Sequence, residues 1–216
     1  MRHLFVASLA ILAVLQPPAA AGMGGATPFR IVPGAYDKKA GERATGAAGP
    51  ATGRVGLKGL SVAVEHLDPQ ARAAFARSID PASPDPFGVP PGRPEFYTTF
   101  LVEFENQSGR EVLFQPGNVA LVTDRGEPQF PVDLTDLYRA AALREAEDPE
   151  ATMRRIAPLI FDSSVTIQTG RRLSRLLVFG PLPPKWKEIR LLFSFLHIGS
   201  ETDTVSLTFH KQVIGG

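Results

Sequence analysis

Short segments in which apolar and polar residues alternate recur from Leu60 to Lys211, and they restrict the fold more than any other feature of this sequence. Side chains two residues apart lie on the same face of a strand, so alternation is typical of strands with one buried face. The clearest segment is 96–105, whose buried face is predicted to carry Phe96, Thr98, Phe100, Val102 and Phe104. Its other face becomes polar at Glu103 and Glu105, as expected for a strand packed on a core.

Turns rich in Gly, Pro, Asn and Asp separate these segments, which favours antiparallel connections. The other predicted strands are 60–65, 111–115, 119–123, 129–132, 164–168, 173–179, 187–198 and 204–211. Residues 199–203 are predicted to join the last two as a hairpin. About eight short strands at this spacing indicate a mainly β, antiparallel β-sandwich, in which two sheets close face to face over rows of Phe and Leu.

Two regions change to helical spacing. Asp68 followed by Pro69 predicts the N-cap and first residue of a helix over 69–79. Asp133 and Asp148 are predicted to cap two short helices, so 133–161 is interpreted as a helical insertion between strands. The six prolines of 80–94 predict an irregular loop, and long loops of this kind are often functional.

The first 21 residues have the pattern of a secretory signal peptide. Twelve residues from Leu4 to Leu15 include only Ser8 as a polar residue, a run too short to span a bilayer. Cleavage is predicted after Ala21, and an uncleaved anchor is the alternative. Residues 22–53 are predicted to be a flexible tether rich in Gly, Ala and Pro, with Phe29–Val32 as a docking segment or as disordered chain. Residues 54–216 are then the sandwich domain.

Cysteine content and charge limit the class of protein further. The chain has no cysteine, so an exported domain must be stabilised by its core rather than by disulfides. Arg2 is the only one of the 23 basic residues in the predicted signal, which leaves 22 basic and 22 acidic residues. This balance favours neither nucleic acid nor an anionic membrane as a partner. No insertion into a membrane is expected after signal cleavage.

Three motifs carry a resemblance to a known group of domains. They are FLVEFENQSG at 100–109, VALVTDRG at 119–126, and TGR at 169–171 leading to LLVF at 176–179. With them, residues 96–211 resemble exported bacterial immunoglobulin-like β-sandwich domains of unknown function. The resemblance implies an interaction or accessory module without catalytic residues. The helical insertion and the proline-rich loop depart from the usual pattern of that group.

No catalytic or cofactor motif is present: the sequence lacks GxGxxG, a Walker-type loop and G-x-S-x-G. The histidines His66, His197 and His210 fall in or beside predicted strands. His197 and His210 could bind a metal together with Glu65 or Asp203, but their spacing matches no known ligand motif. They are interpreted as structural histidines, and no metal or cofactor is predicted.

Paired carboxylates are the other candidate for chemistry. Glu103 and Glu105, near Glu95, could line a glycosidase cleft. A solvated sandwich edge is the preferred interpretation. Asn106-Gln107-Ser108 is formally a glycosylation sequon, but the bacterial style of the signal gives no reason to expect its use.

The candidate interaction surface consists of Arg154, Arg155, Arg171, Arg172 and Trp186. The arginines could form a patch for an acidic partner, or a mixed face neutralised by the acidic residues of 145–150. Trp186, in a proline-rich turn, could anchor a partner or close one end of the sandwich.

The sequence therefore predicts a non-enzymatic interaction or accessory module of the bacterial envelope. It would be periplasmic or extracellular and bind an envelope or secreted protein. A small-ligand or polysaccharide-binding sandwich domain is the alternative, and a concave pocket with convergent polar groups would favour it.

Overall fold

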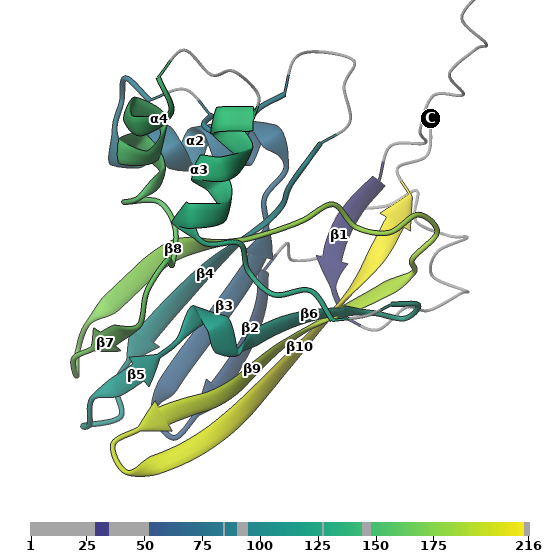
Figure 1. Ribbon diagram of the computed structural model, residues 1–216. Helices are drawn as coiled ribbons and strands as arrows, with labels where there is room; N and C mark the ends of the chain where they lie inside the picture. Colours follow the sequence, from purple (N-terminus) through teal and green to yellow (C-terminus); the bar gives the residue numbers. More distant parts are fainter. Residues whose placement is uncertain are drawn as a thin grey trace, which may run out of the picture.

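The computed structural model describes residues 29–34, 52–83, 85–89, 95–126, 128–143 and 148–213. Two antiparallel sheets make up most of this part of the chain. The smaller sheet has the order β2 (Thr52–Leu57), β3 (Leu60–His66), β4 (Thr98–Asn106), β8 (Arg172–Phe179). The larger sheet has the order β1 (Phe29–Pro33), β10 (Glu201–Val213), β9 (Glu188–Ile198), β5 (Val112–Phe114), β7 (Val165–Ile167) (Figure 1). A sixth strand of this sheet, β6 (Val119–Thr123), also pairs with β9. The predicted mainly β, antiparallel fold is confirmed.

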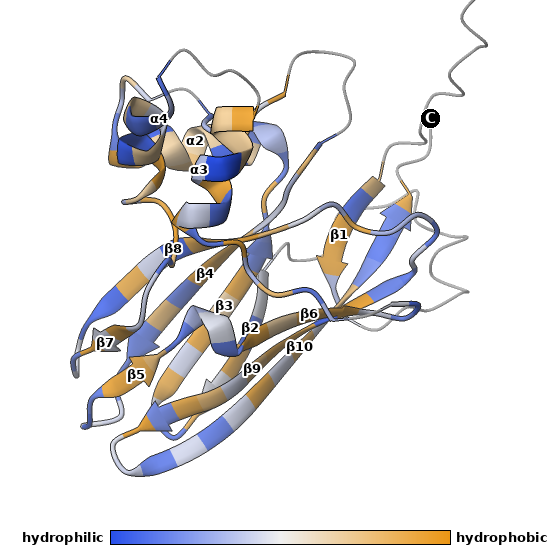
Figure 2. Ribbon diagram, viewed as in Figure 1, coloured by the Kyte–Doolittle hydropathy of each residue, from blue (hydrophilic) through white to orange (hydrophobic). Residues whose placement is uncertain are grey.

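Phenylalanine rings from both sheets form the centre of the main core. Phe100 lies 5.4 Å from Phe209 between ring centroids, and Phe104 lies 4.7 Å from Phe114. Phe104 also contacts Phe193 of β9. Figure 2 shows the alternation of apolar and polar residues along the strands that this packing requires. The two sheets therefore pack face to face.

A second, smaller core lies on the outer face of the smaller sheet. Three helices gather there: α2 (Pro69–Ile79), α3 (Leu134–Leu143) and α4 (Pro149–Ile156) (Figure 1). Their apolar residues pack against Leu176 and Val178 of β8, whose neighbours in sequence face the main core. Asp68 and Asp148 cap α2 and α4 by accepting backbone N–H groups at 2.8 Å, as predicted. No helix in the described part of the chain is long and apolar enough to cross a bilayer.

The predicted tether contains an ordered strand, so that prediction is wrong for Phe29–Pro33. This segment is β1, and it pairs antiparallel with β10 in a register that places Ile31 opposite Lys211. Ile31 and Val32 are buried, which accounts for the stability of so short a strand. The smaller sheet also begins earlier than predicted, at Thr52. The predicted signal peptide, and most of the tether, lie outside the described residues.

The predicted strand 129–132 is also wrong, because it is reduced to one bridge between Gln129 and Leu121. Pro128 and Pro131 flank this bridge, and proline has no N–H group with which to extend a ladder. After β6 the chain therefore leaves the sheet for α3. Both helices of the predicted insertion are present between β6 and β7.

Asn106, at the end of β4, organises the turn into β5. Its side chain is fully buried and donates to the carbonyl oxygens of Arg110 at 2.7 Å and Ile167 at 2.8 Å. Its Oδ1 accepts hydrogen bonds from the backbone N–H and the hydroxyl of Ser108. Because the amide nitrogen is buried and occupied, the sequon has a structural role in the folded protein.

A charged cluster joins the two sheets at the end remote from the helices. Lys58, in the β2–β3 turn, pairs with Glu201 and Asp203 of the β9–β10 hairpin. Arg110 donates to Glu201 from the other side, and the hydrogen bonds from Arg110 and Lys58 lower the pKa of Glu201 to about 2. All of these groups are solvent-accessible, so the cluster orients the hairpin more than it stabilises the fold.

Candidate functional site

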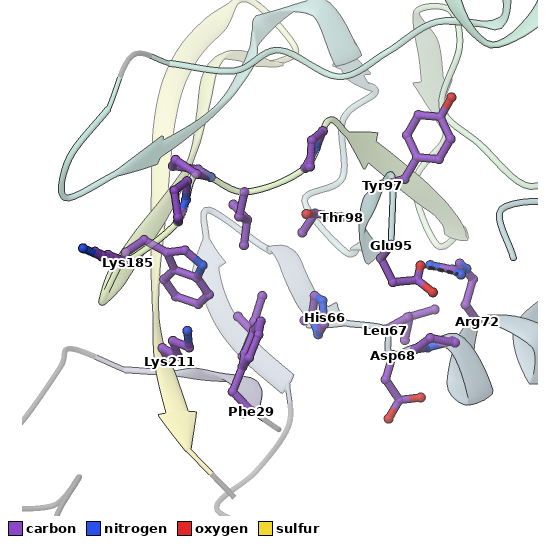
Figure 3. A pocket seen from close by; sticks show the side chains of 17 residues that line it. Phe29, His66, Leu67, Asp68, Arg72, Glu95, Tyr97, Thr98, Lys185 and Lys211 are labelled. Carbon is purple, nitrogen blue, oxygen red and sulfur yellow. Dashed lines mark hydrogen bonds and ion pairs between the residues drawn. The ribbon is translucent and has the colours of Figure 1, made fainter. Parts of the chain in front are cut away.

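A pocket of about 510 Å³ opens beside the main core, where five segments meet. They are β1, the β3–α2 junction, the chain entering β4, the β8–β9 loop and β10 (Figure 3). The lining is largely apolar: Phe29, Ile31, Leu67, Pro69, Tyr97, Pro181, Leu182, Pro183, Pro184 and Trp186. The polar lining residues are His66, Asp68, Arg72, Glu95, Thr98, Lys185 and Lys211. This size and composition are typical of small-molecule sites.

The β8–β9 loop forms one wall, and its sequence explains its course. Its three prolines exclude regular strand pairing, and Lys185 has a left-handed backbone with φ of 66°. The chain then places Trp186 in the main core, where the side chain is only 4% exposed. This position agrees with the alternative that Trp186 closes one end of the sandwich, and Trp186 also lines the pocket.

Aromatic rings and a lysine form one end of the pocket. Phe29 packs edge-on against Trp186, with 5.8 Å between ring centroids. The Lys211 ammonium lies 4.3 Å from the Phe29 ring centroid and 5.7 Å from that of Trp186. A cation in this position is attracted by the electron-rich faces of both rings. Strand β1, which the sequence pattern placed in the tether, therefore supplies a wall of the candidate site.

Arg72 forms the opposite end and is only 1% exposed. Its guanidinium donates to both carboxylate oxygens of Asp85 at 2.7–2.9 Å and to Glu95 at 3.0 Å. Burial opposes the charged form, but the hydrogen bonds with Asp85 and Glu95 outweigh it and raise the pKa of Arg72. The network joins α2 to the proline-rich loop and to the chain entering β4.

His66 lies between these two ends (Figure 3). Its ring is half-buried and packs edge-on against Phe100 at 5.5 Å between centroids. Burial, assisted by Arg72 and opposed by Asp68, lowers the pKa of His66 to about 4. His66 lines the pocket, and within the described residues its imidazole makes no side-chain hydrogen bond, so the neutral ring has one donor and one acceptor nitrogen without a side-chain partner.

The pKa of His66 makes stability depend on pH. The unfolded chain takes up a proton near pH 6.5, whereas the native imidazole resists protonation until about pH 4. The unfolded state therefore binds more protons between these values, and acidification from pH 7 to 4 is expected to cost about 3 kcal/mol at this group. Urea denaturation at pH 7, 5.5 and 4 should show this loss, and His66→Gln should reduce it. Parallel pH profiles for the two proteins would contradict the assignment.

The predicted arginine patch is divided between two ends of the protein. Arg154 and Arg155 are exposed on α4, whereas Arg171 and Arg172 lie at the start of β8, remote from the helices (Figure 1). Arg154 lies within 4 Å of carboxylates of Asp148 and Glu150, and Arg172 within 4 Å of those of Glu103 and Glu105. The structure therefore does not bring the four arginines into one basic surface.

The histidine pair considered as metal ligands is also separated. His197 lies near the β9–β10 turn and contacts Thr202, whereas His210 lies near the opposite end of the hairpin and contacts the Gly34 carbonyl oxygen. No cluster of three metal-ligating side chains occurs among the residues that the structure describes.

The carboxylates considered for glycosidase chemistry are separated as well. Glu103 and Glu105 face Arg172, while Glu95 lies beyond the other end of β4, beside Arg72. Glu103 also accepts a hydrogen bond from the Ser174 hydroxyl.

Comparison of the chain with protein-family models, curated proteins and solved structures finds no match. The candidate site is therefore identified by its cavity and by the contacts of the residues that line it. The sequence pattern missed Phe29, Arg72, Glu95, Lys185 and Lys211 as parts of one site. Only the Asp68–Pro69 cap gave a local signal, because it fixed the helix on which Arg72 lies.

Proposed function

We propose that this protein is a non-enzymatic binding domain of the bacterial envelope and that the pocket holds a small ligand. Of the two functions that the sequence leaves open, the pocket favours ligand binding. The observation that carries the proposal is a largely apolar cavity of about 510 Å³ into which neutral and charged polar groups converge. The signal-peptide pattern of residues 1–21 supports a periplasmic or extracellular location.

A binding role without catalysis fits the state of the polar groups in the pocket. Arg72 is held by two carboxylates, and Asp68 accepts the N–H group of Ala71 as a helix cap. His66 has no hydrogen-bonded nucleophile or carboxylate among the described residues. These groups can orient a ligand, but they lack the base–nucleophile contact on which covalent catalysis depends.

The proposed fold type is an immunoglobulin-like sandwich. Two antiparallel sheets with Phe rings between them, and the motifs of 100–109, 119–126 and 169–179, support this classification. In such a sandwich the loops at one end commonly carry the binding function. Here the β8–β9 loop and the chain entering β4 would have that role.

A second candidate function is an accessory module that binds an envelope or secreted protein. Exposed apolar side chains on the insertion favour it: Tyr138 is 44% exposed and Leu143 is 85% exposed, both on α3. The double variant Tyr138→Glu and Leu143→Glu should abolish the binding of a partner that covers α3. Such binding would survive Phe29→Ala, which alters only the pocket.

The single tryptophan provides a direct assay for the proposed ligand site. Trp186 is the only tryptophan in the chain, so its fluorescence reports on the pocket. Titration with a panel of amphipathic acids, alcohols, amines and oligosaccharides is expected to reveal compounds that shift this fluorescence and raise the melting temperature. Phe29→Ala should weaken binding about tenfold, because the ligand loses apolar contact area.

Phe195→Ala is the matched control for this experiment. Phe195 is 59% exposed and does not line the pocket, whereas Phe29 is 40% exposed and does. The control should bind ligands as the unaltered protein does. If no compound in the panel changes Trp186 fluorescence or the melting temperature, the proposed function is wrong.

A further inference from the structure

Two lysines in the pocket have no carboxylate partner among the described residues. Lys185 and Lys211 line its aromatic end, and neither belongs to any ion pair in the described part of the chain. By contrast, Arg72 at the other end is matched by Asp85 and Glu95. The aromatic end of the pocket therefore carries uncompensated positive charge.

The two sides of the pocket also differ in charge. In Figure 3, Lys211 lies beside Phe29, and Lys185 lies on the same side with its ammonium directed away from Phe29, whereas Asp68 and Glu95 lie on the opposite side with Arg72. An anionic group would be attracted to the first side and repelled from the second. Between the two sides the wall consists of apolar residues, including Leu182 and the loop prolines.

The burial of Trp186 helps to identify the ligand class. Sugar rings bind proteins by stacking on an accessible aromatic face, but Trp186 is only 4% exposed and the Lys211 ammonium lies over its ring. So little of the Trp186 ring is accessible that it offers no stacking surface for a sugar. An apolar ligand body therefore suits the pocket better than a polysaccharide does.

The backbone at Lys185 supports a role for its side chain. A φ of 66° is a conformation that favours glycine, yet a lysine has it here, at the rim of the pocket. Strained positions of this kind cluster at binding sites.

We propose that the pocket binds an amphipathic small molecule with one anionic head group, which Lys185 and Lys211 hold while its apolar body lies along Phe29 and Leu182 toward His66. This inference rests on the proposed function and specifies its ligand. The neutral imidazole of His66 can form a hydrogen bond with a polar atom of the ligand body without requiring a second charge.

The test compares three ligands that share one apolar body: decanoate, decanol and decylammonium. At pH 7.5, decanoate is expected to bind at least about tenfold more tightly than decanol, and decylammonium more weakly than either. The difference between decanoate and decanol should shrink at high salt, because screening weakens charge–charge attraction. Decyl phosphate then distinguishes a phosphate from a carboxylate head group. Trp186 fluorescence and calorimetry measure the affinities.

Lysine variants locate the head group. Lys185→Gln with Lys211→Gln should weaken decanoate binding at least about tenfold and change decanol binding by less than about twofold. Lys185→Arg with Lys211→Arg keeps both charges and should restore most of the affinity for decanoate. Lys187→Gln is the matched control, since this lysine lies in the same segment but does not line the pocket.

The outcomes separate this inference from the proposed function on which it rests. Equal binding of decanoate and decanol, or binding of decanoate unaffected by the double Gln variant, would overturn the anionic head group but leave a ligand pocket in place. Failure of all three decyl compounds, with binding of another class from the wider panel, would also overturn it. Because the ligand comparison uses the unaltered protein, it decides the question even if a variant fails to fold.

Discussion

Replacing Arg72 with methionine is expected to lower the free energy of unfolding by about 3–5 kcal/mol. The Arg72 side chain is 2% exposed, and its loss would leave Asp85, with a side chain only 12% exposed, without its cationic partner. A buried charge without a partner is costly because it has lost its hydration and gained nothing in return. Urea denaturation followed by Trp186 fluorescence and circular dichroism measures the change.

Arg77→Met is the control for this prediction. Arg77 lies on the same helix but is exposed, so its replacement should change the free energy of unfolding by less than about 0.5 kcal/mol. Replacing Arg72 and Asp85 together by apolar residues should cost less than the sum of the two single changes, since neither charge is then left unpaired. A loss below about 1 kcal/mol for Arg72→Met would mean that water reaches the pair.

Asn106→Asp is expected to destabilise the protein by about 2–4 kcal/mol, although it preserves the size and shape of the side chain. Both donors of the Asn106 amide point at carbonyl oxygens, those of Arg110 and Ile167. A carboxylate in the same place would set negative charge against both carbonyl dipoles at a fully buried site. Thermal and urea denaturation give the loss.

Ser108→Ala tests the accepting side of the same residue. It removes the hydroxyl hydrogen bond to Asn106 Oδ1 and the hydroxyl contacts with the backbone of Arg110, but keeps the backbone hydrogen bond to Asn106 Oδ1. About 1–2 kcal/mol of destabilisation is therefore expected. The Asn106→Asp variant should regain part of its stability at low pH, where the new carboxyl group becomes neutral and can donate. Equal stability of this variant and the unaltered protein at pH 7 would show that solvent enters the turn.

Local sequence signals predicted the elements whose stability is set locally. Asp68 with Pro69 predicted the start of α2, and the alternation of Phe100, Val102 and Phe104 predicted β4, because caps and strand periodicity act over a few residues. The extent of 129–132 was overestimated, since a proline on each side of the bridge limits pairing more than apolar content promotes it.

The pocket could not be predicted in this way, because no single segment contains it. Phe29 and Lys211 are brought together by the register of β1 on β10, and pairing between distant segments leaves no local pattern. His66 and Trp186 were each noticed alone, but their relation depends on how the β8–β9 loop folds over β3. The site is a property of the tertiary structure.

The pairing of β1 with β10 also constrains how the protein reaches its native state. Strand β1 precedes the other described elements in the chain, whereas its partner Glu201–Val213 follows all of them, so β1 is synthesised long before the strand it pairs with. Strand β1 therefore has no partner until Glu201–Val213 has been synthesised, and the larger sheet cannot be completed before then. Such high contact order is associated with slow folding, so completion of the pocket would be one of the late events in the maturation of this protein.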